Sequence, residues 1–357
     1  MSDNREVLPR IARYKPYYFK PVPGKTYFWC SCGRSNNQPF CDRSHKGTQF
    51  QPVEYVATES DAEVLLCGCK HSKSQPFCDG SHNNLLSTYE VDDPQSDANQ
   101  NKIYVAYHRS GRFELNGSCY VARIDELSSN STGNVSWSCA VTDATGAKFQ
   151  AMFFLEIGSG LTPVISFGES EVILFLTGGR GEIEISGRTF ALHPNSGVYI
   201  RRGEAFRIDN HGHTTMAIYA SACPQATAPS FDKRMTSNFD AAAPERIVAL
   251  DPKKLQRMAD RSFQLLVSKE IGSQVVTQFI GTIPLSKAAP HRHLYEEALI
   301  VLSGHGMIWT EDLKTKVRPG DVIFLPSKQV HSLQCTDPQG MQIVGVIYPG
   351  GNPDINF

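Results

Sequence analysis

Six of the ten cysteines lie in the first quarter of the chain, in two groups whose spacing could hold a metal. Each group has three cysteines and one histidine: Cys30, Cys32, Cys41 and His45 in the first, and Cys67, Cys69, Cys78 and His82 in the second. All four positions recur at a shift of 37 residues, which predicts two copies of one small unit. Three soft thiolates and one imidazole can hold either zinc or an iron–sulfur cluster. The single residue between the first two cysteines is a tighter spacing than zinc sites usually have.

The residues around the third cysteine of each copy predict how the ligands are presented. In the first copy Pro39 comes two residues before Cys41 and Asp42 follows it, and the second copy repeats this order. We expect a fixed turn that presents the cysteine, followed by a short helix that the aspartate caps. That helix would carry the histidine of each copy on its first turn.

The second copy contains Cys-Asp-Gly-Ser-His over residues 78–82, and with its Cys-x-Cys pair it strongly resembles the CDGSH iron–sulfur family, the mitoNEET-type proteins. The resemblance covers residues 25–90, and the first copy departs from the signature at Arg43, where the family has glycine. It implies one [2Fe–2S] cluster per copy, held by the three cysteines and the histidine, in a tandem arrangement that needs no dimer. The imidazole ligand should raise the reduction potential and couple it to pH. The alternative is a pair of zinc knuckles that only stabilise the domain.

Another ligand set lies near the other end of the chain and consists of His291, His293, Glu297 and His331. We expect His291 and His293 to lie on one strand, where alternate side chains point to the same face. The segment 320–331 would return the third imidazole on a partner strand. Three imidazoles and one carboxylate favour Fe, Mn, Ni or Cu over Mg or Ca.

These residues match the two cupin motifs, His-x-His-x3-Glu-x6-Gly and Gly-x5-Pro-x4-His. In metal-binding cupins the four corresponding residues are the ligands, so the resemblance implies that role for all four here. Leu285 and Lys328 stand where glycine is common in this family. The alternative is a metal-free cupin with buried structural histidines.

An earlier segment resembles this barrel but lacks its histidines. We align Glu171 with Glu297, which places Ile165, Phe167 and Arg207 at the positions of the three histidines. The resemblance to bicupins spans residues 102–357, and it implies that the first barrel is a scaffold without a metal.

The remaining sequence predicts a mainly β protein. Its 28 glycines and 21 prolines favour turn-rich β structure over helical bundles. We expect a small CDGSH domain over residues 1–92, a degenerate cupin barrel over 102–222 and a metal-binding cupin barrel over 245–357, both of jelly-roll type. Residues 91–101 are polar and predict a linker. One helix is predicted from Asp251, as its N-cap, to Ala259.

Charge and hydropathy exclude some classes of partner. The 35 basic and 36 acidic side chains give a net charge of −1, without the basic excess of a nucleic-acid or polybasic membrane binder. No apolar run approaches the roughly 18 residues of a membrane span. Residues 1–6 lack the apolar core of a secretory signal. We therefore expect a cytoplasmic protein that binds neither nucleic acid nor a membrane.

Together the two kinds of site suggest a hypothesis for the reaction. Fe(II) in the cupin would act on dioxygen and a small-molecule substrate, while the two clusters relay electrons from a reductase or ferredoxin, by the logic of Rieske oxygenases. The expected enzyme is a non-haem iron oxidoreductase (a monooxygenase, dioxygenase or oxidase) with Mn, Ni, Cu or Zn as alternative metals. Two alternatives stay open: a quercetinase-type dioxygenase that does not use the clusters, and a redox or iron sensor without turnover. Tyr295, His305 and Trp309 are candidates for the pocket lining, and a homo-oligomer is compatible with the sequence.

Overall fold

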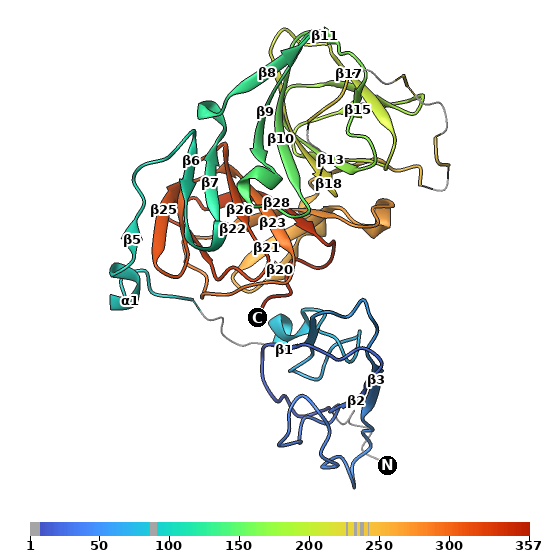
Figure 1. The fold of residues 1–357 in the computed structure, drawn as a ribbon, viewed down its shortest axis with the longest axis vertical. Coiled ribbons are helices and arrows are strands. Elements are labelled where there is room, and N and C mark those ends of the chain that lie inside the picture. The colour runs from blue at the N-terminus through green and yellow to red at the C-terminus, as the bar shows by residue number, and fades with distance from the viewer. Residues whose placement is uncertain (1–7, 86–90, 226–227, 232–233, 236–238, 242) are drawn as a thin grey trace. The chain divides into compact units, whose positions relative to one another are not determined.

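The computed structural model describes residues 8–85, 91–225, 228–231, 234–235, 239–241 and 243–357 (Figure 1). Residues 1–6, which carry the expectation about a secretory signal, lie outside this described part. The chain forms two compact units, one of Met1–Tyr89, His291–Leu294 and Asn352–Phe357, and the other of Glu90–Pro290 and Tyr295–Gly351. Among the described residues, no helix is long and apolar enough to cross a membrane.

The first unit contains two short antiparallel sheets. In one sheet β1 (Tyr17–Phe19) pairs with β4 (Val64–Leu66), and in the other β2 (Thr26–Trp29) pairs with β3 (Val53–Val56). The residue before each Cys-x-Cys pair bridges to the phenylalanine before the third cysteine, Trp29 to Phe40 and Leu66 to Phe77. This repeated bridge confirms that the two motifs are copies of one structural unit. Trp29 and Leu66 also lie in the shared buried core.

A helix follows the third cysteine in only one of the two copies. In the second copy η1 (Ser81–Leu85) is a 3-10 helix that carries His82. In the first copy residues 44–47 form a turn, because the chain reverses at Gly47, whose φ is 78°. The aspartate makes the same local hydrogen bond in both copies: Asp42 Oδ1 accepts one from Ser44 N, and Asp79 Oδ1 accepts one from Ser81 N at the start of η1, each at 3.0 Å. The predicted helix in the first copy is wrong.

The second unit contains two β-barrels, each made of a large and a small sheet. In the N-terminal barrel the large sheet has the strand order β19-β16-β13-β18-β10-β9-β8, and the small sheet contains β11, β12, β14, β15 and β17. The large-sheet strands are β8 (Ser129–Thr132), β9 (Val135–Val141), β10 (Ala151–Ile157), β13 (Glu171–Gly178), β16 (Ser196–Ile200), β18 (Met216–Cys223) and β19 (Ile247–Ala249). The small-sheet strands are β11 (Gly160–Leu161), β12 (Ile165–Ser166), β14 (Gly181–Ile185), β15 (Arg188–Leu192) and β17 (Ala205–Asn210).

The C-terminal barrel is built in the same way. Its large sheet has the order β20-β21-β22-β28-β23-β26-β7-β6 and its small sheet the order β27-β24-β25-β5. The large-sheet strands are β6 (Arg112–Glu114), β7 (Tyr120–Arg123), β20 (Gln256–Met258), β21 (Arg261–Val267), β22 (Thr277–Ile283), β23 (Glu296–Ser303), β26 (Asp321–Leu325) and β28 (Met341–Tyr348). The small-sheet strands are β5 (Ile103–Tyr104), β24 (Gly306–Trp309), β25 (Leu313–Val317) and β27 (Ser332–Cys335). The short helices of this unit are α1 (Asp97–Gln100), η2 (Asn116–Ser118), η3 (Ile124–Glu126), η4 (Asp143–Thr145), η5 (Pro252–Lys254) and η6 (Lys269–Ile271).

The two barrels exchange strands across the predicted domain boundaries. β5, β6 and β7 precede the N-terminal barrel in sequence but belong to the sheets of the C-terminal barrel. There β5 pairs with β25, β7 pairs with β26, and β6 pairs with β7. Conversely, β19 follows the N-terminal barrel and pairs with its strand β16. Segments 102–123 and 247–249 therefore each complete a sheet of the other barrel. The domain boundaries expected from the sequence, at residues 102 and 245, do not include this exchange.

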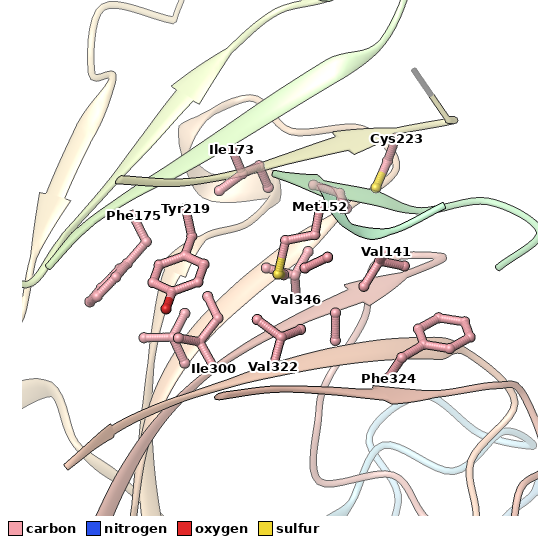
Figure 2. Packing of buried hydrophobic residues seen from close by; sticks show 14 of the residues in the cluster. Val141, Met152, Ile173, Phe175, Tyr219, Cys223, Ile300, Val322, Phe324 and Val346 are labelled. Carbon is pink, nitrogen blue, oxygen red and sulfur yellow. The ribbon is translucent and has the colours of Figure 1, made fainter. Parts of the chain in front are cut away.

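The large sheets of the two barrels face each other across a shared apolar core (Figure 2). Met152, Ile173 and Tyr219 reach this core from the N-terminal barrel, and Ile300 and Val346 reach it from the C-terminal barrel. Each barrel also has its own apolar interior, formed by the alternate side chains of the same strands. The side-chain alternation along β13 and β23 therefore decides which residues can enter a barrel and which lie between barrels.

The helix predicted from Asp251 to Ala259 is wrong beyond its first turn. Asp251 caps as predicted, since its Oδ1 accepts a hydrogen bond from Lys253 N at 3.0 Å, but η5 ends at Lys254. Residues 256–258 then form β20, which pairs with β21. Pairing with a neighbouring strand overrides the local helical pattern.

Candidate metal and cluster sites

The first cysteine motif places its four ligand atoms in two close pairs. Cys30 Sγ lies 3.7 Å from Cys32 Sγ, and Cys41 Sγ lies 3.1 Å from His45 Nδ1. Two sulfurs on one tetrahedral metal with bonds of about 2.3 Å would be about 3.8 Å apart. Because the described cysteines form no disulfide, these pairs fit two metal ions with two protein ligands each, which is what a [2Fe–2S] cluster requires.

The second motif has the same geometry and is more deeply buried. The Cys67–Cys69 Sγ distance is 3.5 Å, and Cys78 Sγ lies 3.5 Å from His82 Nδ1. Burial lowers the pKa of His82 to about 4, so its imidazole is neutral and able to ligate at neutral pH. The hydrogen bond with Cys69 lowers the pKa of Cys67 to about 6. The residues of each motif therefore fit an iron–sulfur cluster that is held by three cysteines and one histidine.

The two copies differ at the position after the motif's aspartate. Arg43 and Gly80 both have left-handed backbones, with φ values of 75° and 88°. An arginine in this conformation carries strain of about 1–2 kcal/mol, which a glycine avoids. A Cβ at Gly80 would lie 3.2 Å from side-chain atoms of Asn352 and Asp354. The second copy thus favours glycine at this position, because Asn352 and Asp354 lie close to it.

Residues 352–357 form a strap on the loop of the second motif. Asn352 Nδ2 donates a hydrogen bond to Asp79 O at 3.0 Å. Asn83 Nδ2 donates to Asp354 Oδ1 at 2.6 Å and to Asp354 O at 3.1 Å. Burial raises the pKa of Asp354 to about 7, and the hydrogen bond from Asn83 opposes this shift. Burial raises the pKa of Cys78 to about 12, and the nearby carboxyl group of Asp354 adds a smaller contribution to this shift.

Three of the four predicted cupin ligands come together. The ligand atoms of His293, Glu297 and His331 all lie within 4.8 Å of one another, and all three residues are buried. Gln329 O lies 2.9 Å from His331 Nδ1, so that ring nitrogen donates to the carbonyl and Nε2 is left to ligate. Two imidazoles and one carboxylate fit a divalent transition metal with open positions.

His291 lies outside this group of three. It is only partly buried, and residues 292–295 are irregular, so His291 and His293 do not share a regular strand as expected. The period of two on which that expectation rests applies only from β23 onward. The role of His291 as a fourth ligand stays a prediction.

The three residues predicted as candidates for the pocket lining have different surroundings in the structure. Tyr295 is buried in the apolar interior of the C-terminal barrel. Trp309 Nε1 donates a hydrogen bond to Gln334 Oε1 at 3.1 Å, and His305 is largely exposed beside Asp337. Among the three, only Tyr295 belongs to the interior cluster.

The glutamate expected to remain in the N-terminal barrel does not face its interior. Glu171 pairs with Cys223, the last residue of β18, just as Glu296 pairs with Tyr348, the last residue of β28. The structural counterpart of Glu171 is therefore Glu296, and the alignment of Glu171 with Glu297 is wrong by one residue.

The one-residue error in the alignment arises from the glycines at the ends of β13 and β23. The sequence alignment matches Gly178 with Gly304, but the left-handed glycines are Gly179, with φ 90°, and Gly304, with φ 76°. With these two matched, Val172 is the counterpart of Glu297. By the same register Phe206, and not Arg207, stands at the position of His331.

Glu171 and Glu296 instead connect the two barrels reciprocally. Glu171 accepts hydrogen bonds from Ser273 Oγ at 3.0 Å and from Gln274 N at 3.1 Å. Glu296 accepts from the backbone nitrogens of residues 148 and 149 at 2.7 and 2.9 Å. Val172 and Phe206 lie in the apolar interior of the N-terminal barrel, and neither side chain can ligate a metal.

Sequence reasoning missed two residues that support the sites. Gln329, two residues before His331, orients that imidazole through its backbone carbonyl, and because any residue type supplies a carbonyl, the sequence does not mark this position. Asp354 lies 271 residues after Asn83, and no sequence pattern links them.

Two family models match parts of the chain. The model described as an iron-binding zinc finger of the CDGSH type matches residues 9–46 and 49–83, and the cupin domain model matches residues 282–347. Each CDGSH match contains one complete ligand set, and the cupin match contains residues 291–331.

Part of the chain is also similar to curated proteins. It is 48% identical over 54 residues to "CDGSH iron-sulfur domain-containing protein 3, mitochondrial" of Mus musculus, and 46% identical over 52 residues to the Homo sapiens protein of that name. The matches cover 15% and 14% of this chain and 39% and 41% of the relatives, so the chain spans about two fifths of their length.

Solved structures resemble the second unit in fold. The protein Ylba from E. coli is 16% identical with a TM-score of 0.53, over 68% of this chain and 95% of that chain. A deletion mutant of Bacillus subtilis oxalate decarboxylase is 11% identical with a TM-score of 0.52, over 64% and 76%. Procruciferin, an 11S globulin from Brassica napus, is 10% identical with a TM-score of 0.53, over 64% and 83%. These similarities confirm the mainly β, jelly-roll architecture. The chain therefore carries an N-terminal CDGSH iron–sulfur domain and a cupin domain.

Proposed function

We propose that this protein is a bicupin oxidoreductase in which two [2Fe–2S] clusters relay electrons to a mononuclear Fe(II) centre. One observation carries the proposal: a buried group of two histidines and one carboxylate lies on the same chain as two sets of three cysteines and one histidine. Two-histidine, one-carboxylate sets are typical of non-haem Fe(II) oxygenases. Bound Fe(II) would supply the reaction with dioxygen, and a reductase or ferredoxin would supply the electrons.

The residues of the chain would position and shield this centre. The hydrogen bond from His331 Nδ1 to Gln329 O fixes the orientation of one ligand, as second-shell contacts commonly do. Leu299 and Leu333 line the apolar barrel interior, which favours a small substrate and limits entry of water. The proposed compartment is the reducing cytoplasm, where thiolate ligands persist, and we propose no nucleic-acid or membrane partner.

The test is whether the cupin metal controls the oxidation of the clusters. Both clusters are reduced without oxygen and then mixed rapidly with dioxygen, and their reoxidation is followed by visible absorbance. The protein is compared with Glu297→Gln, which removes one metal ligand, and with Glu182→Gln, which removes an exposed carboxylate from β14 of the other barrel.

We expect reoxidation to be at least tenfold slower in Glu297→Gln and unchanged in Glu182→Gln. Equal rates in all three proteins would contradict the relay. That result together with activity of the unreduced protein would favour the quercetinase-type alternative, in which the substrate supplies all electrons.

A further inference from the structure

Lys70 occupies a position where the first copy of the motif has a glycine. Its counterpart is Gly33, and the two backbones are equally left-handed, with φ values of 70° and 72°. In the first copy a Cβ would lie only 1.7 Å from Arg10 O, so no side chain fits there. In the second copy the lysine adopts this strained backbone conformation, which glycine would adopt without strain. A strained non-glycine residue of this kind points to a role for its side chain.

The side chain of Lys70 is 1% exposed and is held in one place. Its Nζ donates a hydrogen bond to Cys67 O at 3.1 Å and lies 4.5 Å from the ring centroid of Trp29. Trp29 Nε1 donates to the same carbonyl oxygen, also at 3.1 Å. Since Trp29 immediately precedes Cys30, these contacts connect the ammonium group to the backbone segments of both motifs.

The geometry places this buried ammonium group beside both motifs. It hydrogen-bonds the backbone of Cys67 in the second motif and lies over the ring of Trp29, which precedes Cys30 of the first motif. A buried cation is costly unless negative charge compensates it. Thiolate ligands of the two motifs can supply that charge.

We infer that Lys70 is an electrostatic element shared by the two cluster sites, which raises the reduction potential of both clusters. Each cluster gains one electron on reduction, and a nearby fixed positive charge in a low-dielectric interior stabilises that added negative charge. The inference rests on the part of the proposed function in which both motifs hold clusters, and it does not depend on the cupin metal or on turnover.

The experiment is an anaerobic redox titration of the full-length protein, compared with Lys70→Met and with Lys73→Met. Lys73 is an exposed lysine three residues further along the same loop, so its substitution is a matched control for charge removal. The two clusters are assigned with His82→Cys, which alters the optical spectrum of the second cluster only. Iron and sulfide content are measured first, to establish that each protein holds two clusters.

In Lys70→Met we expect the ratio of reduced to oxidised protein at a fixed applied potential to fall at least tenfold for each cluster, or about 59 mV for a one-electron couple. Lys73→Met should leave both ratios within twofold. A shift of the second cluster alone would overturn the shared role, and so would no shift. Lys70→Arg keeps the charge and should retain both potentials; if it lowers them as Lys70→Met does, packing and not charge is responsible.

If the variants lose a cluster, a measurement on the unsubstituted protein tests whether Lys70 interacts with both clusters. The protein is labelled with 15N-lysine, and the ammonium resonance of Lys70, identified by its absence from Lys70→Met, is followed by NMR during stepwise reduction. We expect this resonance to shift at both steps, whereas a response to one step only would overturn the inference. Wild-type protein without clusters would refute the proposed function itself, and a failed relay would leave these potentials unaffected.

Discussion

Asp354 should make the stability of the first unit fall as pH rises from about 4 to about 7. The residue is 5% exposed, and burial raises the pKa of its carboxyl group from the ordinary value of 3.8 to about 7. Between these two values the folded state binds more protons at Asp354 than the unfolded state does. Stability is therefore fully present below pH 4 and is lost as the pH passes through 7. A difference of about three pKa units corresponds to about 4 kcal/mol.

The perturbation that isolates this effect is Asp354→Asn. The amide keeps an oxygen that can accept the hydrogen bond from Asn83 Nδ2, but it cannot ionise. Urea unfolding is followed by the visible absorbance of the clusters at pH 5, 6 and 7, and the difference between the two proteins removes the pH dependence of the ligands themselves. Glu59→Gln, which neutralises an exposed carboxylate in the same unit, is the control.

The free energy of unfolding of the wild type should fall, relative to Asp354→Asn, by about 1.4 kcal/mol per pH unit at most within this window. Glu59→Gln should follow the wild type. Parallel pH profiles for the wild type and Asp354→Asn would refute the reasoning, because they would mean that Asp354 ionises equally in both states.

Three further predictions concern the motif loop, the barrel contact and the metal ligands. Gly80→Ala should destabilise the first unit by about 1–2 kcal/mol in urea unfolding, because the left-handed backbone is strained and the new Cβ crowds the strap, whereas Arg43→Gly should stabilise it by about 1 kcal/mol. Glu296→Ala should lower the free energy of unfolding of the barrels by about 0.5–1.5 kcal/mol for each of the two hydrogen bonds that it removes; an unchanged melting temperature would contradict this. Glu297→Gln should reduce the mononuclear metal content several-fold in elemental analysis while the cluster absorbance stays at its wild-type value.

The cluster ligands are predictable from sequence because each set lies within 16 consecutive residues and its turn residues are local. Asp42 and Asp79 cap their turns as the pattern predicts. The strap over the second motif is not predictable, because Asp354 reaches it from the far end of the chain. Lys70 is likewise invisible in the sequence, since its importance depends on burial between two motifs.

The barrels show the same division between local and distant information. Strands such as β13 and β23 are predicted by their apolar runs and terminal glycines. The adjacent pair Gly178 and Gly179 leaves the register ambiguous by one residue, and a slip of one residue exchanges the two faces of a strand. That ambiguity places Glu171 on the wrong face of β13. The exchange of β5–β7 and β19 between barrels depends on long-range pairing, which no local pattern encodes.

The central claim is that two iron–sulfur clusters and one mononuclear metal centre coexist on this chain. The most direct measurement is metal and acid-labile sulfide analysis of protein purified without oxygen, together with visible and EPR spectra. Two [2Fe–2S] clusters require about four irons and about four sulfides per chain, and the cupin site adds about one further iron. Zinc at all three sites, with no labile sulfide, would contradict the account.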